Sequence, residues 1–512
     1  MNFAEALKEQ GNFGRTENGA VKHLTTKSDV LDMFAFGGAY RSRSIEDKIT
    51  LFKNAYYEDK ELALKCLFYL RDCRGGQGER DFFKACYKWL AINDREVAKH
   101  NLEFIPTYGR WDDLYCLVDT PLEKEMFSFM RRVFELDLES KTPSLLGKWL
   151  KSENASSKES RKLATKTMRA FGLTERQYRK KVSSLRQRIK IVESLMSQDR
   201  WDEIKFDKLP SKAGFIYRNA FARNDYTKER YKAFMENKAT KVNSSTLYPY
   251  EIVNKAASLR WIINNREVEI NTINKYWENL PDYTEGRNSN TLCVVDTSGS
   301  MTSNLPGSTS NCRDVAVSLG IYFAEKIKGD FHNMFISFSE HPNIHTLKGH
   351  TLTDKFNSIN MADWGMNTNI EKVFELLLTT AIRNNTKSAD LPERILIISD
   401  MEFDEALGEG SYWNTGKNNQ RCLLRTQTLM EDMRKKWSSH GYTLPKLVYW
   451  NVNARNNNIP DLGEDVSFVS GFSPSIFKQI MSNKTGYELM LETLTAERYA
   501  QVTVEFNQKK RK

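Results

Sequence analysis

Apolar residues recur every three to four positions through the first half of the chain, which predicts a series of helices. One such helix has Phe82, Cys86 and Trp89 on a single side, with charged residues between them. Glycine-containing breaks, DCRGGQG at 72–78 and YGRWDD at 108–113, separate neighbouring helices. Short connections favour a helical-repeat (HEAT-like) domain or an irregular bundle. The helices expected in this part span 45–56, 61–71, 79–92 and 95–105.

The pattern weakens over 140–165, which indicates a loop or a loosely packed helix, and returns as a helix over 174–196 with Val182 and Leu185 on its apolar side. After a polar linker at 281–290, short apolar strands alternate with helices. That alternation predicts a parallel sheet covered on both faces, a doubly wound, Rossmann-like α/β domain. The expected strands are 291–295, 333–338, 394–399, 446–452 and 466–470, and the expected helices are 312–327, 369–383, 421–438 and 474–482.

These patterns predict two main domains. We expect an all-α helical-repeat domain at 31–280 and the α/β domain at 288–490. An N-terminal extension, 1–30, precedes them, and a C-terminal helix with a basic tail, 491–512, follows. A chain of 512 residues is long enough for more than one hydrophobic core.

Composition is that of a globular protein, with 40% hydrophobic and 28% charged residues. No run approaches the roughly 18 apolar residues of a membrane span, and the first residues show no signal-peptide pattern. The seven cysteines include no CxxC pair, which favours free thiols in a reducing compartment. We therefore expect a cytoplasmic protein with no membrane partner.

Positive charge is concentrated in one segment. The chain has a net charge of +10, and residues 158–190 carry twelve lysines and arginines against only Glu159 and Glu175. Such a field suits the phosphates of a nucleic acid or an acidic protein surface. The alternative is an ordinary solvated helix face.

A second feature is an acid followed by two hydroxyls where the first strand ends. Asp296, Ser298 and Ser300 follow the strand 291–295, Thr368 precedes the helix from 369, and Asp400 follows the strand 394–399. Loops after parallel strands meet at one edge of the sheet. Two carboxylates and three hydroxyls are oxygen ligands, which suit a hard divalent cation, above all Mg²⁺. Taken alone, Asp296 could instead cap the next helix.

The spacing Asp-x-Ser-x-Ser with a distal Thr and a distal Asp resembles the metal-ion-dependent adhesion site of von Willebrand factor A domains. The resemblance implies that Ser298, Ser300 and Thr368 contact the metal directly, and that Asp296 and Asp400 hold it directly or through water. It also implies a coordination position left open for a carboxylate of an acidic protein partner.

Longer motifs resemble an uncharacterised family of A-domain proteins related to the Ro/TROVE RNA-binding proteins. In the second half these are DWGMNTNIEKVF, SDMEFDEA, YWNVNAR and VSGFSP; in the first half they are RDCRGGQGERDFF, YGRWDDL, SLLGKWL and LYPYEIV. The resemblance covers roughly residues 30–485, with Asn369 standing where the family has an acid. It implies a helical ring closed by an A domain that binds small structured or misfolded RNA.

RNA binding is therefore the leading hypothesis, through backbone contacts that depend on salt and on RNA shape. Two motifs also have a structural interpretation: Arg71 and Arg80 can pair with Asp72 and Glu79, and Arg110 can pair with an acid beside a buried Trp111. The candidate RNA-binding residues are Arg74, Arg80, Arg176, Arg179, Lys180, Lys181, Arg186, Arg188 and Lys190.

The competing hypothesis is a protein-interaction scaffold that uses the metal site without binding RNA. An enzyme is not expected, because the chain has no P-loop, HExxH, GxSxG or dinucleotide-binding glycine motif. His341, His345 and His350 lie close in sequence but lack a cysteine partner for zinc. A nuclease acting through Asp296 and Asp400 would lack a general base or a second metal cluster.

Overall fold

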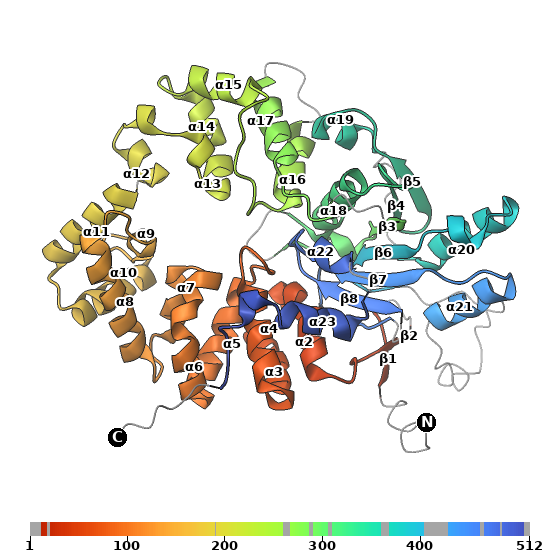
Figure 1. The fold of residues 1–512 in the computed structure, drawn as a ribbon, viewed down its shortest axis with the longest axis horizontal. Helices are drawn as coiled ribbons and strands as arrows, with labels where there is room; N and C mark the ends of the chain where they lie inside the picture. Colours follow the sequence, from red (N-terminus) through yellow and green to blue (C-terminus); the bar gives the residue numbers. More distant parts are fainter. Residues whose placement is uncertain are drawn as a thin grey trace.

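The structure, a computed structural model, describes residues 12–17, 21–189, 191–259, 267–285, 290–305, 310–359, 368–403, 429–460, 465–481 and 484–505. The helices of the first half follow one another along an arc, and a six-stranded sheet lies between the two ends of that arc (Figure 1). The prediction of a helical first half and an α/β second half is confirmed. Within the described ranges, no helix is long and apolar enough to cross a membrane.

The helical region divides into two runs. The first contains α2 (Asp29–Phe36), η1 (Gly37–Ser42), α3 (Ile45–Glu58), α4 (Lys60–Arg71), α5 (Arg80–Asn93), α6 (Arg95–Asn101), η2 (Leu102–Phe104), α7 (Ile105–Tyr108), η3 (Trp111–Leu117), α8 (Glu123–Glu139), α9 (Leu146–Trp149), α10 (Lys158–Phe171) and α11 (Glu175–Ile189). The second contains α12 (Val192–Ser197), η4 (Trp201–Glu203), η5 (Phe206–Lys208), α13 (Ser211–Ile216), α14 (Arg218–Arg223), α15 (Lys228–Glu236), α16 (Pro249–Leu259) and α17 (Glu267–Glu278).

The helix expected over 174–196 is thus two helices, because Ile191 has an extended backbone (φ −63°, ψ 130°).

The sheet has the strand order β5-β4-β3-β6-β7-β8. Every neighbouring pair is parallel except β4 and β5, which are antiparallel. The edge strand β5 was not predicted, because PNIHT lacks an apolar run, so the sheet is mixed and not fully parallel. The strands are β3 (Thr291–Asp296), β4 (Met334–Phe338), β5 (Pro342–Thr346), β6 (Arg394–Ser399), β7 (Lys446–Asn451) and β8 (Val466–Ser470).

Helices cover both faces of this sheet, which is why every residue of β3 and β6 is buried. The helices that the structure describes in this half are η6 (Ser300–Thr302), α18 (Cys312–Lys326), α19 (Leu352–Asn357), α20 (Glu371–Arg383), η7 (Ser388–Asp390), α21 (Leu429–Ser439), α22 (Ile476–Ile480), α23 (Gly486–Leu494) and η9 (Glu497–Tyr499). Two strands, β1 (Phe13–Arg15) and β2 (Val21–His23), form a separate antiparallel pair near the N-terminus.

The hydrophobic cores do not follow the boundary between the two halves of the chain. One core joins Val294, Ile397 and their neighbours on one face of the sheet to the helices between α2 and α11. The other joins the opposite face, with Val295 and Ile398, to α18 and to the helices between α12 and α17. Each end of the helical region is therefore packed into a core that includes one face of the sheet.

The turn between α4 and α5 is a meeting point for distant segments. Its Gly76 carbonyl accepts a hydrogen bond from the Ser475 hydroxyl (3.3 Å), and its Gln77 carbonyl accepts one from the Tyr248 hydroxyl (3.2 Å). The turn needs its glycines: Gly78 has φ +73°, and a Cβ on Gly76 would lie 1.9 Å from the carbonyl oxygen of Tyr69. The glycines of RGGQG thus have a structural explanation.

Charged residues flanking this turn pair differently from the sequence-based expectation. Arg71 pairs with Asp113 (2.6 Å), and both side chains are buried. Arg80 also pairs with Asp113 (3.0 Å), as well as with Asp112. The two acids expected as partners, Asp72 and Glu79, pair with other arginines. Asp72 accepts a hydrogen bond from Arg498, and Glu79 pairs with Arg41 (2.7 Å). The predicted pairing was wrong because side chains that are adjacent in sequence at a helix end point to different neighbours in space.

The Asp113 carboxylate is the centre of this network. Burial alone would raise its pKa, but Arg71 and the backbone N–H of Arg110 outweigh burial and hold the pKa below its usual value. Arg110 pairs with Asp112 (3.3 Å), as expected. Trp111 is only partly buried and stacks on Phe129, with ring centroids 5.5 Å apart.

The C-terminal segment returns to the first helices. After α23, residues 495–505 cross α4 and α6, where the Val504 N–H donates to Glu61 (2.7 Å) and the Thr503 N–H donates to Asn101 (3.2 Å). The Tyr499 ring stacks on Tyr108 at 5.5 Å. Residues 495–505 are therefore a docked strap, and the basic end of the chain, 509–512, lies outside the described residues.

We expect Asp113→Ala to lower the free energy of unfolding by about 3–5 kcal/mol, because the buried Arg71 guanidinium loses its partner. Urea denaturation measures this change. Glu135→Ala is the control: it breaks an exposed pair with Arg131 and should cost less than about 1 kcal/mol. Equal destabilisation of the two variants would contradict the structural role of Asp113.

Candidate functional site

The candidate metal ligands lie where two adjacent parallel strands end. Asp296 is the last residue of β3, and Asp400 follows β6 directly. The chain leaves β3 towards β4 on one side, whereas β6 lies on the other side. The strand order therefore reverses at this place, and such a point is where open α/β sheets bind ligands.

Polar contacts connect four of the five predicted ligands. The Ser298 N–H donates to Asp296 Oδ1 (2.9 Å), and the Ser298 and Ser300 hydroxyl oxygens are 3.1 Å apart. The Ser300 hydroxyl donates to Asp400 Oδ1 (3.2 Å). Asp296 Oδ2 accepts a hydrogen bond from Ser399 (2.5 Å), a residue of β6 that fixes the orientation of this carboxylate.

Thr368, the fifth predicted ligand, is buried at the same edge of the sheet. Its neighbour Asn369 donates its backbone N–H to the carbonyl of Ser339, just after β4 (2.9 Å). The Asn369 side chain accepts the Lys372 N–H (3.2 Å) in the first turn of α20. An asparagine oxygen can accept that bond as a carboxylate would. Residues 363–367 of the same motif lie outside the described ranges.

Two carboxylates are buried together in this site. Asp296 and Asp400 are both 0% exposed. Burial raises the pKa of Asp400 to about 7, the Asp296 carboxylate adds to the shift, and Arg455 opposes it. A cation between the carboxylates would relieve both their repulsion and their loss of hydration.

The donor set fits a hard cation. The side chains that meet here offer carboxylate and hydroxyl oxygens, the ligands that Mg²⁺ prefers. Cys293 is buried inside β3, where burial raises the pKa of its thiol, so it does not compete as a thiolate ligand. In the described part of the chain, no three His, Cys, Asp or Glu side chains gather in a metal-binding cluster. A cation at this edge would therefore depend on the serine and threonine hydroxyls.

Two further charged residues lie beside the site, outside the predicted set of ligands. Arg455, in the loop after β7, donates to Asp400 Oδ2 (3.1 Å). Glu402 is buried and accepts hydrogen bonds from the Glu17 N–H (2.9 Å) and from the Asn456 side chain (3.0 Å). The YWNVNAR motif contains Arg455, but its approach to Asp400 follows from the pairing of β7 with β6.

The basic segment presents a charged outer face. Tyr178, Val182 and Leu185 form the buried side of α11. Eight basic side chains of α10 and α11 are exposed: Lys158, Arg161, Lys162, Arg169, Arg176, Arg179, Lys180 and Lys181. They include four of the predicted RNA-binding residues. Lys166, by contrast, is engaged by Asp119 and Glu123.

The last two arginines of α11 have structural contacts. Arg186 donates to the carbonyls of Gly147 (3.0 Å) and Leu150 (2.8 Å), and Arg188 donates to the carbonyl of Ser140 (2.7 Å). These bonds hold α11 against α9 and the end of α8. Lys190, also a predicted RNA-binding residue, lies outside the described residues.

Arg74 and Arg80, predicted in the first helices, differ in their surroundings. Arg74 is exposed and donates to the carbonyl of Thr107 (3.2 Å). Arg80 belongs to a cation-rich cluster around Asp112 and Asp113 that also includes Arg71, Lys84, Arg110 and Lys151. Burial lowers the pKa of Lys84 and of Arg110, and the neighbouring Arg80 lowers both further. Positive charge exceeds negative charge in this cluster.

The three histidines considered for zinc have different surroundings. His345 lies in β5, with Nε2 2.7 Å from the Ser337 hydroxyl, and it stacks on Phe335. His341 Nδ1 lies 3.3 Å from Lys372 Nζ, a cation that disfavours a bound metal. His350 is exposed in the turn before α19.

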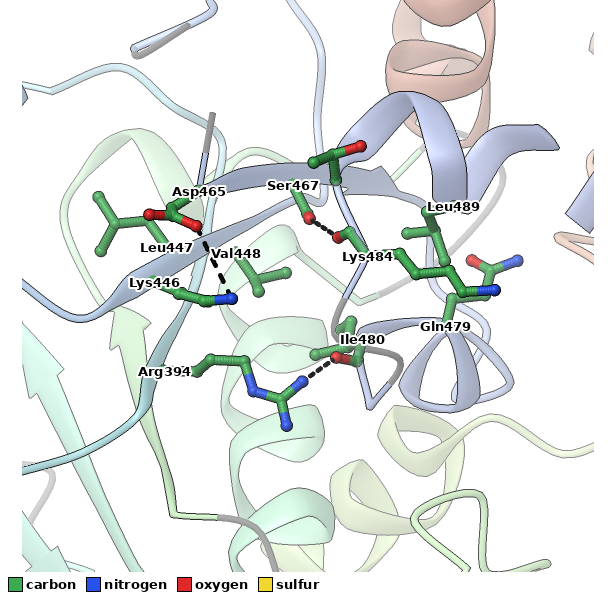
Figure 2. A pocket seen from close by; sticks show the side chains of 11 residues that line it. Arg394, Lys446, Leu447, Val448, Asp465, Ser467, Gln479, Ile480, Lys484 and Leu489 are labelled. Carbon is green, nitrogen blue, oxygen red and sulfur yellow. Dashed lines mark hydrogen bonds and ion pairs between the residues drawn. The ribbon is translucent and has the colours of Figure 1, made fainter. Parts of the chain in front are cut away.

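A small pocket of about 50 Å³ lies at the opposite edge of the sheet, where β6 and β7 begin (Figure 2). Its charged side chains already have partners: Arg394 donates to the carbonyl of Ile480 (2.7 Å), Lys446 lies 3.7 Å from Asp465, and Lys484 pairs with Glu492 (2.8 Å). This pocket is separate from the candidate metal centre.

Comparison with known families gives two matches. Residues 16–285, in two overlapping parts (16–169 and 143–285), match the model "Domain of unknown function (DUF2828)". Residues 290–512 match "Domain of unknown function (DUF7788)". An uncharacterised protein of Acanthamoeba polyphaga mimivirus is 30% identical over 516 residues, covering 92% of this chain and 85% of that protein.

Among solved structures, the chain is similar to the Ro (RSR) protein of Deinococcus radiodurans. The alignment covers 90% of this chain and 100% of the Ro chain, with 14% sequence identity and a TM-score of 0.46.

Proposed function

The chain belongs to the family defined by the DUF2828 domain, and we propose that it is a non-catalytic RNA-binding protein with a cation-dependent docking site at the edge of its sheet. The observation that carries the first part is the exposed basic face of α10 and α11. The motif resemblance to Ro/TROVE proteins supports the same conclusion.

The basic face has the properties of a phosphate-binding surface. The segment that carries these eight exposed cations contains only two acids, Glu159 and Glu175. Glu175 lies 4.0 Å from Arg179 in an exposed pair of little strength. Arg186 and Arg188 hold α11 in place through backbone carbonyls. The exposed cations of α11 (Arg176, Arg179, Lys180 and Lys181) therefore project from an anchored helix. A rigid array of cations favours a structured RNA, whose phosphates have fixed spacing.

The cation-rich cluster around Asp112 and Asp113 offers a second contact region. Arg110 lies over the ring of Trp149 at 4.4 Å, so a cationic plane and an aromatic ring are already stacked there. Arg80 remains 36% exposed despite its ion pairs. We propose that this region contacts RNA phosphates in addition to the face of α10 and α11.

We expect the quadruple variant Arg176→Glu, Arg179→Glu, Lys180→Glu and Lys181→Glu to bind a fluorescently labelled small stem-loop RNA at least about tenfold more weakly at low salt. The slope of log K against log salt should also become shallower, by about 0.7–0.9 for each RNA phosphate that the variant no longer neutralises. Fluorescence anisotropy across a salt series measures both quantities.

The control is a variant of equal charge change elsewhere: Lys205→Glu, Lys208→Glu, Lys238→Glu and Lys241→Glu, all at exposed positions. This control variant should retain most of the wild-type affinity for the RNA. Equal weakening in both variants would mean binding to overall charge alone, and no RNA binding by the wild type at low salt would reject the RNA-binding function.

The second part of the proposal is an A-domain-like adhesion site. Asp296, Ser298, Ser300, Thr368 and Asp400 would hold Mg²⁺ or another hard divalent cation. The bound cation would supply a coordination position for a carboxylate of an acidic protein partner. The support lies in the buried carboxylate pair and in the hydroxyl contacts that connect it.

For this site, we expect Mg²⁺ at about 100 times its Kd to raise the wild-type free energy of unfolding by about 2.7 kcal/mol. Asp296→Asn should abolish this increase, because it removes one of the two buried carboxylates. Asp330→Asn, at an exposed position, should retain it. Thermal unfolding with MgCl₂ and with EDTA measures the difference, and an unchanged Mg²⁺ effect in Asp296→Asn would reject the site.

A further inference from the structure

Arg455 joins the candidate metal centre to the N-terminal segment. One guanidinium nitrogen donates to Asp400 Oδ2 at 3.1 Å, and another lies 3.4 Å from Glu17 Oε2. Asp400 is fully buried, whereas the Glu17 side chain is 51% exposed. The same cation is thus shared between a metal-ligand candidate and a surface carboxylate.

The backbone at Arg455 is fixed while its side chain has two partners. Its carbonyl accepts a hydrogen bond from Arg43, and its Nε has no hydrogen-bond partner in the described part of the chain. A short movement of the guanidinium would therefore exchange one carboxylate for the other without moving the loop.

The local charge leaves room for a divalent cation. When ionised, Asp296, Asp400, Glu402 and Glu17 carry four negative charges. Two positive charges oppose them: Arg455, which pairs with Asp400 and Glu17, and Lys22, which lies close enough to Glu402 and Glu17 to interact with their charges. A cation bound to Asp400 would repel Arg455 and would replace it as the partner of the Asp400 carboxylate. The nearest alternative acceptor is Glu17, which already also accepts a hydrogen bond from Asn456 (3.0 Å).

Glu17 belongs to a segment docked on the loops that end β6 and β7. The Thr16 hydroxyl donates to the carbonyl of Phe403 (2.7 Å), and the Glu17 N–H donates to Glu402 (2.9 Å). Further along, the His23 N–H donates to the carbonyl of Ile459 (2.8 Å). A stronger Arg455–Glu17 pair would hold this segment more tightly.

Building on the proposed metal site, we propose that Arg455 is a resident counter-ion of that site, and that a bound cation transfers it from Asp400 to Glu17. Occupancy of the site is then coupled to docking of the described N-terminal residues, 12–17 and 21–23. Without the cation, Arg455 stabilises Asp400; with it, Arg455 fastens the segment beside the position where an acidic partner would bind.

Mg²⁺ affinity of the full-length protein tests the competition. We expect Arg455→Gln to bind Mg²⁺ at least about tenfold more tightly than the wild type, because a competing positive charge is gone. Arg455→Lys, which keeps the charge, should stay within about threefold of the wild type, a difference of less than about 1 kcal/mol. Arg383→Gln, at an exposed position on α20, is the matched control. Isothermal titration calorimetry with MgCl₂ measures each Kd, and thermal unfolding confirms that each variant is folded.

Hydrogen–deuterium exchange of residues 12–23 tests the coupling. Saturating MgCl₂ should slow exchange in this segment of the wild type and of Glu96→Gln, an exposed control. It should have no effect there in Glu17→Gln or Arg455→Gln, because neither variant can form the Arg455–Glu17 pair.

The outcomes separate the two proposals. Equal Mg²⁺ affinity in the wild type and Arg455→Gln would overturn the competition and leave the metal site standing. Tighter binding without any Mg²⁺ effect on residues 12–23 of the wild type would overturn the coupling. No Mg²⁺ binding by either protein would overturn the metal site and this inference together. Binding by Arg455→Gln alone would support the metal site and the competition but would overturn the transfer of Arg455 to Glu17.

Discussion

The docking of the turn between α4 and α5 onto the far end of the chain is the constraint on which the overall layout depends. Gly76 and Gln77 receive hydrogen bonds from the segment after β8 and from the start of α16, and Asp72 pairs with Arg498 of the C-terminal strap. These bonds join segments up to 426 residues apart. A side chain on Gly76 would collide with the backbone, so close approach requires glycine there.

This junction makes the helical region and the sheet one cooperative structure. Each sheet face shares its core with a different run of helices, and η1 also bonds directly to the loop that carries Arg455: the Ala454 N–H donates to the carbonyl of Ala39 (3.1 Å). Neither half buries its apolar surface without the other. The edge of the sheet that carries Asp296 and Asp400 is therefore in contact with the first helices of the chain.

Arginine has several distinct uses in this protein, and the environment of each guanidinium separates them. Arg71 is buried against Asp113 and holds two helices together, Arg186 is committed to backbone carbonyls, and Arg176 projects into solvent. The guanidinium group suits all of these uses because it remains charged and has five donors in a fixed plane. Only the exposed group is available to phosphate.

The sequence by itself determined the elements and the chemistry of the site. Apolar periodicity located several helices of the first half and five of the six strands of the main sheet, because local burial patterns follow the geometry of each element. It did not locate α2 or α8, and α10 begins in a stretch that was interpreted as a loop or a loosely packed helix. The Asp296–Ser298–Ser300 spacing, with Asp400 after a later strand, predicted oxygen-bearing side chains that meet at one edge of the sheet. Tertiary structure alone decided which charges meet. Arg71 pairs with Asp113, and Arg455 reaches Asp400, through packing and strand pairing between segments far apart in the chain. The edge strand β5 likewise forms because β4 offers it backbone partners, although its own residues lack a strand pattern.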